Sequence, residues 1–150
     1  MRDAVTAHQK EAGEAGVTLT ADVATAVQVE SDAHRVRQVV SNLVQNALRV
    51  TNAGGRIGVS ARAEGSTAVI EVADTGPGIE GADLPHVFER SYLWRASKGT
   101  RRVGTGLGLA IVRELVTALG GRVTVDSIVG RGTTFRIVLP ARAPAPVKHA

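Results

Sequence analysis

Two asparagines spaced one helical turn apart are the first residues in the sequence whose types and spacing suggest chemistry. Asn42 and Asn46 fall on the polar face of an amphipathic pattern over 31–50, and Arg49 follows about one turn later. Asparagine is a poor helix former in mid-helix, and Lys or Glu would suit a solvent-exposed face equally well. Amide oxygens can bind Mg²⁺ without adding charge, and arginine pairs with phosphate. We therefore favour a functional face over the ordinary wet face that amphipathicity alone would indicate.

A second candidate site lies where an apolar strand pattern runs into DTGPG at 74–78. Asp74 is placed at the strand end, where its carboxylate can accept a hydrogen bond from an exocyclic amine such as that of adenine. Gly76 and Gly78 lack a Cβ and would let a flat ring approach the backbone closely. The alternative is a plain tight turn, because Asp, Pro and Gly are the usual turn formers.

A third candidate is the run GTGLG at 104–108, directly before an apolar segment. It matches neither a P-loop, because no Lys-Ser/Thr follows, nor the dinucleotide fingerprint, because the glycine spacing differs. The backbone N–H groups at the start of the following helix form an anion site. Three cations just upstream favour that interpretation over a flexible hinge before a core helix: Lys98, Arg101 and Arg102.

The elements that must position these groups follow from periodicity and turn residues. We expect strands over 17–23, 26–30, 56–65, 66–74, 122–130 and 132–140, the first two as a hairpin or paired strands. We expect helices over 31–50 and 107–121, a helical turn near 82–87, and the end of a helix or a linker in 1–16. The order of these elements predicts a two-layer α/β sandwich, a mixed sheet covered on one face by helices.

Two segments lack such a pattern. Residues 88–106 are the best candidate for a mobile segment, and the Pro/Ala-rich tail 141–150 is expected to be disordered.

Composition excludes several classes of protein. The chain of 150 residues has no cysteine, so disulfides and cysteine-ligated zinc are excluded. The net charge of +4 raises nucleic acid as a partner, but the basic residues are dispersed and aromatics are only 3%, so we expect no nucleic-acid binding. No apolar run reaches the roughly 20 residues of a membrane span, and we expect no direct membrane contact.

Four separated motifs together resemble the N, G1, F and G2 boxes of sensor histidine kinases. They are NLVQNAL, DTGPGIE, LPHVFERSY and GTGLGLAIVRELV, in that order, within a match that extends over 32–140. The resemblance implies the Bergerat fold of the GHKL superfamily. In that fold about three helices cover a mixed five-stranded sheet, and a flexible lid, here 89–105, closes over ATP.

The resemblance also implies roles for individual residues. Asn46 resembles the Mg²⁺ ligand, Asn42 its phosphate-side neighbour and Arg49 a basic phosphate contact, and these three form the expected catalytic set. Asp74 resembles the acceptor for the adenine amine, and Thr133 a residue that helps to hold adenine. The expected ATP-binding residues are Asn42, Asn46, Arg49, Asp74, Gly76, Gly78, Ile79, Tyr92, Arg95, Lys98, Gly104, Thr105, Gly106, Leu107, Gly108, Leu109 and Thr133.

Three departures from the family pattern stand out. Val50 occupies the position where the family often has an aromatic that stacks on adenine. The F box reads Ser-Tyr-Leu at 91–93 where Phe-Tyr-Arg is common, so Leu93 replaces a lid arginine and Arg95 or Lys98 is the candidate substitute. No histidine stands in a phosphoacceptor box.

We therefore expect 17–140 to be the ATP·Mg²⁺-binding catalytic domain of a two-component sensor histidine kinase, and 1–16 the tail of a linker from a dimerisation and phosphoacceptor domain outside this sequence. Hydrolytic relatives place a Glu where Asn42 stands, and an amide cannot act as a general base. The expected partners are that domain and a response regulator, in a homodimeric, membrane-anchored bacterial sensor with this domain in the cytoplasm. The alternatives are a GHKL-fold ATPase or serine kinase, and a nucleotide-sensing module without transfer activity.

Overall fold

The computed structural model describes residues 2–24, 32–90, 92 and 107–141 of the chain. Within these ranges lie five strands, three α-helices and one 3₁₀ helix. In chain order they are α1 (Arg2–Glu14), β1 (Thr18–Val23), α2 (Ala33–Val50), β2 (Arg56–Glu64), β3 (Thr67–Asp74), η1 (Leu84–His86), α4 (Leu107–Ala118), β4 (Arg122–Ile128) and β5 (Gly132–Pro140).

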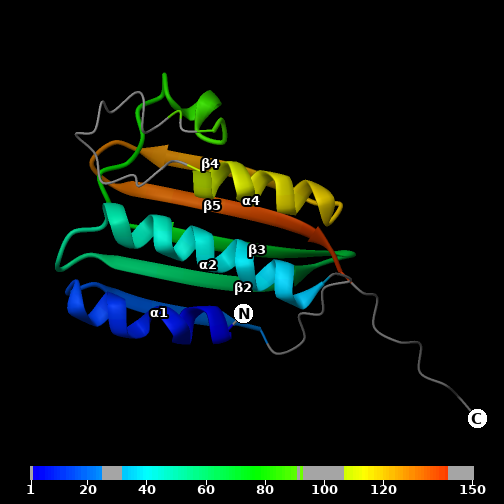
Figure 1. Cartoon of the computed structure of the whole chain (residues 1–150), viewed down its shortest axis with the longest axis horizontal. Coiled ribbons are helices and arrows are strands. Elements are labelled where there is room, and N and C mark those ends of the chain that lie inside the picture. Colours follow the sequence, from blue (N-terminus) through cyan, green and yellow to red (C-terminus); the bar gives the residue numbers. More distant parts are fainter. Residues whose placement is uncertain (1, 25–31, 91, 93–106, 142–150) are drawn as a thin grey trace, which may run out of the picture.

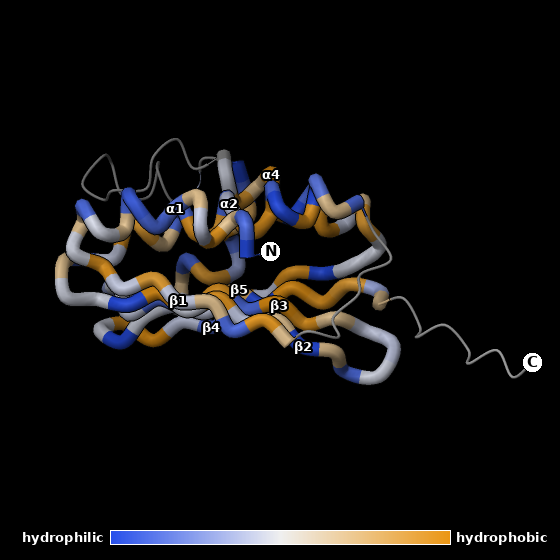
Figure 2. Tube along the Cα trace, turned by 90° about the horizontal axis from the view of Figure 1, so that it is seen from below, coloured by the Kyte–Doolittle hydropathy of each residue, from blue (hydrophilic) through white to orange (hydrophobic). Residues whose placement is uncertain are grey.

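The five strands form one mixed sheet in the order β1-β2-β3-β5-β4. β1 pairs with β2 in parallel, and the other neighbours are antiparallel. The three helices lie side by side over one face of the sheet, and apolar residues fill the space between the two layers (Figures 1 and 2). The predicted two-layer α/β sandwich with a mixed sheet covered on one face is confirmed.

The long helix α2 forms because its sequence supplies both a cap and an apolar stripe. The Asp32 carboxylate accepts a hydrogen bond from the backbone N–H of His34, which satisfies one of the free donors at the helix start. Apolar residues recur at three- and four-residue spacing and are buried against the sheet and the flanking helices: Val36, Val39, Val40, Leu43, Val44, Ala47 and Leu48. The helix ends at Val50, before Gly54 with its φ of 88°.

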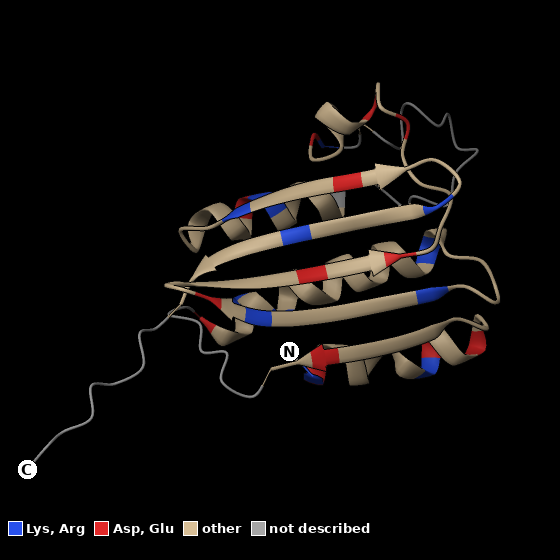
Figure 3. Ribbon diagram, turned by 180° about the vertical axis from the view of Figure 1, so that it is seen from behind, with Lys and Arg blue, Asp and Glu red and all other residues tan. Residues whose placement is uncertain are grey.

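Strand alternation gives the sheet two unlike faces. Ile57, Ile70 and Ile137 are fully buried on the face that the helices cover. The opposite face has no helix over it, as Figure 3 shows, and on it Glu71 accepts hydrogen bonds from Arg62 and Arg136 on the neighbouring strands. Cross-strand register places Asp74 opposite Ile57 on β2 and opposite Thr133 on β5, all on the helix-covered side. The sheet therefore delivers Asp74 and Thr133 to one place.

The N-terminal segment is a docked helix. Ala4, Val5 and Ala12 of α1 are buried, and Gln9 donates a side-chain hydrogen bond to the carbonyl of Leu19 at 2.8 Å. Of the two expectations for 1–16, the end of a helix or a linker, the structure shows a helix over 2–14, which forms part of the helical layer. That this helix continues a linker from another domain stays a prediction.

β1 corresponds to the expected strand over 17–23, and its pairing with β2 makes β1–α2–β2 a parallel unit connected by a helix. The expected partner strand over 26–30 lies outside the described residues, as do nearly all of the segment expected to be mobile and the tail 142–150. The helical turn near 82–87, the helix from 107 and the C-terminal pair of strands are confirmed as η1, α4, β4 and β5. No helix among the described residues is long and apolar enough to cross a membrane.

Candidate functional site

The polar face of α2 carries side chains without partners. Asn42 and Asn46 are half-buried and Arg49 is exposed. Within the part of the chain that the structure describes, none of the three side chains makes a hydrogen bond or an ion pair. A half-buried amide that the protein leaves unpaired is available to a ligand or a metal ion. Among the described residues no cluster of three or more His, Cys, Asp or Glu could hold a metal ion.

Asp74 is a buried carboxylate at the end of β3. It is 8% exposed, and its Oδ1 accepts a hydrogen bond from the backbone N–H of Gly76 at 2.8 Å. No cationic side chain of the described residues pairs with it. Burial raises the pKa of Asp74, and hydrogen bonds from the backbone amides of Gly76 and Thr133 act in the opposite direction. An isolated, buried acceptor of this kind is typical of a ligand-binding position.

The glycines after Asp74 are required by close packing of the chain on itself. A Cβ at Gly76 would lie 2.9 Å from Oδ1 of Asp74 and 3.1 Å from the carbonyl oxygen of Val50. Gly78 has a φ of 78°, and a Cβ there would overlap the carbonyl of Ile128 in β4. The loop is thus pressed between the end of α2 and the end of β4. From the sequence we expected these glycines to let the flat ring of a ligand approach the backbone, and that role stays a prediction.

Ser127 on β4 connects this loop to β5. Its Oγ accepts a hydrogen bond from the backbone N–H of Ile79 at 2.7 Å. The same oxygen lies 2.8 Å from Oγ1 of Thr133 and 3.0 Å from the carbonyl oxygen of Gly132. Thr133 is 6% exposed, and Asp74, Ser127 and Thr133 line a shared hollow of about 240 Å³. Ser127 was missing from the sequence-based site.

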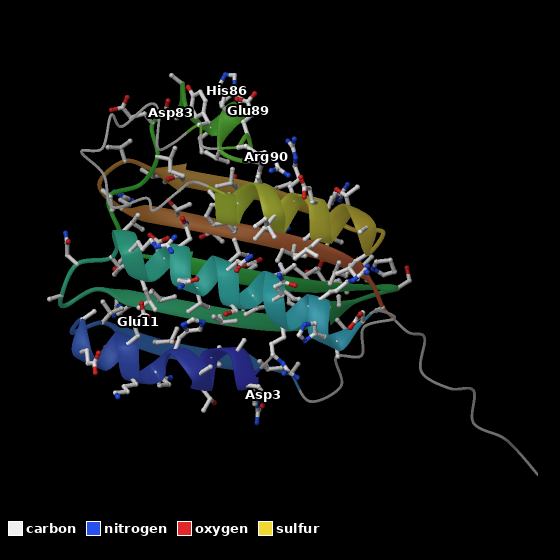
Figure 4. All side chains as sticks on the ribbon, viewed as in Figure 1. Asp3, Glu11, Asp83, His86, Glu89 and Arg90 are labelled. Carbon is white, nitrogen blue, oxygen red and sulfur yellow. The ribbon has the colours of Figure 1, made fainter. Side chains whose placement is uncertain are left out.

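The base of the expected lid is held by side chains around η1. Tyr92 donates its hydroxyl to Asp83 at 3.1 Å, and its ring stacks on His86 with centroids 4.7 Å apart. Arg90 donates to Glu114 of α4 at 2.9 Å. Asp83, His86 and Arg90 lie together beside α4 in Figure 4. Tyr92, expected at the ATP site, therefore has its hydroxyl engaged by the protein.

The remaining expected residues divide into two groups. Ile79 and Leu109 are buried, and a Cβ at Gly108 would meet nothing within 4 Å from the described residues beyond its own helix. α4 begins at Leu107, so a helix start follows the glycine run as expected. Five expected residues lie outside the described ranges: Arg95, Lys98, Gly104, Thr105 and Gly106. The structure thus places Asp74, Gly76, Gly78, Ile79 and Thr133 around one strand end.

The α/β domain thus carries a buried carboxylate at the end of a central strand and a polar helix face. Residues 31–143 match the family described as histidine kinase-, DNA gyrase B-, and HSP90-like ATPase, and the chain belongs to it.

The similar relatives are sensor histidine kinases. The chain is 35% identical over 137 residues to the sensor histidine kinase RppB of Synechocystis sp., covering 91% of this chain and 30% of RppB. It is 40% identical over 114 residues to the sensor histidine kinase WalK of Bacillus subtilis, covering 75% of this chain and 19% of WalK. A structure of full-length ShkA in complex with AMPPNP superimposes with a TM-score of 0.83 at 32% identity, covering 97% of this chain and 30% of that chain. The chain thus spans less than a third of the length of these relatives.

Proposed function

We propose that this chain is the catalytic domain of a sensor histidine kinase, which binds ATP with Mg²⁺ and presents the γ-phosphate to a histidine on a separate domain. The observation that carries the proposal is Asp74, a buried carboxylate that no described cation neutralises. Such a group can accept a further hydrogen bond from a ligand, and the exocyclic amine of adenine is a suitable donor. The family match and the AMPPNP bound by ShkA favour an adenine nucleotide as that ligand.

The polar face of α2 suits the phosphate end of the nucleotide. The amides of Asn42 and Asn46 have no partner among the described residues, and amide oxygens are ligands that Mg²⁺ accepts. Asn46 would hold the ion, and Mg²⁺ when bound would neutralise charge on the phosphate oxygens. Asn42 would donate its amide N–H to a phosphate oxygen, and the exposed Arg49 would add a charged donor.

Catalysis in this proposal is positioning and electrostatics, with no general base from this chain. Asn42 stands where hydrolytic relatives have a Glu, and an amide cannot take a proton from water. A neutral imidazole needs no such help, because it is already nucleophilic at neutral pH. The isolated domain should therefore hydrolyse ATP very slowly while supporting transfer to a histidine.

The partners follow from the same proposal. The acceptor histidine belongs to a dimerisation domain, and a response regulator takes the phosphoryl group from it. The expected membrane anchor and homodimer belong to the longer protein, of which this chain would be a cytoplasmic domain.

The test supplies this chain with a separately expressed acceptor helix pair carrying a candidate histidine, together with radiolabelled ATP. We expect label on the helix pair that acid removes, because phosphohistidine is acid-labile. Acid-stable label would indicate a serine kinase, and brisk ATP turnover by the chain alone would indicate an ATPase. Normal Mg²⁺·ATP binding with no transfer to the acceptor would indicate a nucleotide-sensing module.

A further inference from the structure

Ser127 occupies a central position that the proposed mechanism does not use. It lies on β4, with its hydroxyl between the Asp74–Gly78 loop and the start of β5. Among the described residues, three groups lie within hydrogen-bond distance of its Oγ: the N–H of Ile79 at 2.7 Å, Oγ1 of Thr133 at 2.8 Å and the carbonyl oxygen of Gly132 at 3.0 Å. A serine hydroxyl has one proton to donate and two lone pairs to accept with.

Counting protons fixes the direction of each bond. The N–H of Ile79 donates, so it takes one lone pair of Ser127. The carbonyl of Gly132 accepts, so the single proton of Ser127 goes to it. The remaining contact then requires Thr133 to donate its own proton into the second lone pair of Ser127. If Ser127 donated to Thr133 instead, it would lose the bond to Gly132 and leave the Thr133 proton without that acceptor.

This arrangement leaves Thr133 with no proton for a ligand. Its Oγ1 retains lone pairs, and Thr133 faces Asp74 across the β3–β5 pair. The Asp74 carboxylate is also an acceptor when ionised. The end of the site formed by these two residues therefore offers acceptors to a ligand.

We propose that Ser127 is a specificity-determining positioning residue, which orients the Thr133 hydroxyl as an acceptor and so selects a purine with a 6-amino group over one with a 6-oxo group. The inference rests on the proposed binding of an adenine nucleotide. A 6-oxo purine presents an acceptor where 6-aminopurine presents a donor, and it would face the lone pairs of Thr133 and Asp74. Without Ser127, the Thr133 hydroxyl can turn and donate its proton to the 6-oxo group.

The experiment compares the binding of ADP and IDP, which differ at the 6-position of the base, to the 150-residue chain by isothermal titration calorimetry. The variants are Ser127→Ala, Ser127→Thr, Thr133→Val and the double variant Ser127→Ala/Thr133→Val. Thr124→Ala is the matched control, since Thr124 is a hydroxyl on β4 that lies opposite Arg136, is exposed, and does not line the hollow. Circular dichroism and thermal melts establish that each variant folds.

We expect the wild-type chain to prefer ADP, and Ser127→Ala to reduce the ratio of ADP to IDP affinity by about three- to tenfold, the worth of one hydrogen bond. Ser127→Thr and Thr124→Ala should keep the wild-type ratio. The double variant should fall no further than Thr133→Val, because Ser127 acts through Thr133. A role limited to stabilising the loop would weaken ADP and IDP binding equally and leave their ratio unchanged.

An unchanged ratio in Ser127→Ala overturns the inference, whether or not ADP binding weakens. If Ser127→Ala does not fold, an unchanged ratio in Thr133→Val overturns it instead. Equal binding of ADP and IDP by the wild-type chain also overturns it and leaves the proposed function standing. Failure of the wild-type chain to bind ADP overturns the proposed function itself.

Discussion

Two carboxylates three residues apart on β3 have opposite surroundings. Glu71 lies on the open face of the sheet, where its Oε1 accepts hydrogen bonds from Arg136 at 3.0 and 3.1 Å and from Arg62 at 3.3 Å. Hydrogen bonds from Arg136 and then from Arg62 lower the pKa of Glu71. Asp74 lies on the helix-covered face with no cation from the described residues, and burial raises its pKa. Figure 3 marks the acidic and basic positions along the strands.

The difference separates a charge that is paired within the fold from one whose surroundings suit the ligand of the proposed function. Glu71 is paired across three neighbouring strands, from β2 to β5, so its charge is neutralised within the protein. The ionised form of Asp74 costs folding free energy, because a buried carboxylate lacks the solvation it has in water, and burial accordingly raises its pKa. We expect a residue to carry an uncompensated cost in folding free energy where ligand binding, rather than stability, determines its type.

The largest effect that can test this comparison is on nucleotide affinity. Asp74→Asn should weaken ADP binding by about 10- to 100-fold, the worth of a hydrogen bond to a charged acceptor. The matched variant Glu71→Gln should change ADP affinity by less than about twofold, since Glu71 lies on the far face of the sheet. Isothermal titration calorimetry on the two variants measures both values. Equal losses in the two variants would remove the distinction between the faces.

A somewhat smaller effect concerns the metal. Asn46→Ala should weaken Mg²⁺·ATP binding by about tenfold, within the range expected when a single ligand or hydrogen bond is lost. ADP binding without Mg²⁺ should stay near the wild-type value in this variant, whereas Asp74→Asn should weaken binding with and without the ion. Gln45→Ala, on the exposed side of the same helix, is the control. Loss of metal-free binding in Asn46→Ala would contradict the role given to Asn46.

The two carboxylates should also affect stability in opposite directions at pH 7. Asp74→Asn should raise the free energy of unfolding of the ligand-free chain by up to about 1 kcal/mol, because it removes a buried charge and keeps an oxygen that can accept from Gly76. Glu71→Gln should lower it by less than about 1 kcal/mol, since the pair with Arg136 is partly exposed to solvent. Urea denaturation measures both changes. A lower free energy of unfolding in Asp74→Asn would contradict the interpretation of Asp74 as a buried carboxylate that costs folding free energy.

The smallest expected effect is the change with pH in the free energy of unfolding of each variant relative to the wild type. The raised pKa of Asp74 means that the folded chain takes up a proton before the unfolded chain does, so the cost of the charge is relieved as the pH falls through the folded value, above 3.8. The lowered pKa of Glu71 means that its stabilisation is fully present above 4.5 and is lost as the pH falls from there through the folded value. Denaturation of wild type and both variants from pH 7 downward should show each difference shrinking. ADP affinity should fall with protonation of Asp74.

Local patterns predicted the elements and the polar face of α2. The Asp32 cap, the apolar spacing from Val36 onward and the glycine stop identify α2 without tertiary information. The pairing of β1 was less accessible. Two short runs close in sequence suggest a hairpin, whereas β1 pairs with β2 in parallel through the α2 crossover, which adjacency in sequence does not indicate.

The site likewise contains residues that the sequence indicates and residues that only the folded structure reveals. Asp74 was accessible because a strand pattern ends there before Gly-Pro-Gly. Ser127 was not, because in RVTVDSIVG it resembles any polar residue near the end of a strand, and its role depends on contacts with Ile79 and Thr133 that only the folded sheet creates. The hydroxyl of Tyr92 is bonded to Asp83, a contact that the motif alone did not reveal.

The pairing of β3 with β5 has a consequence for folding. Asp74 and Thr133 become neighbours only when the last strand joins the middle of the sheet, between β3 and β4. A partly folded chain that lacks β5 would carry the polar face of α2 but no complete base-binding end. A nucleotide would then bind the chain with a complete sheet and would not bind the partly folded chain. By mass action, it would shift the folding equilibrium toward the fully folded state. Only a domain with a completely assembled sheet would then bind the nucleotide and be able to transfer its phosphoryl group.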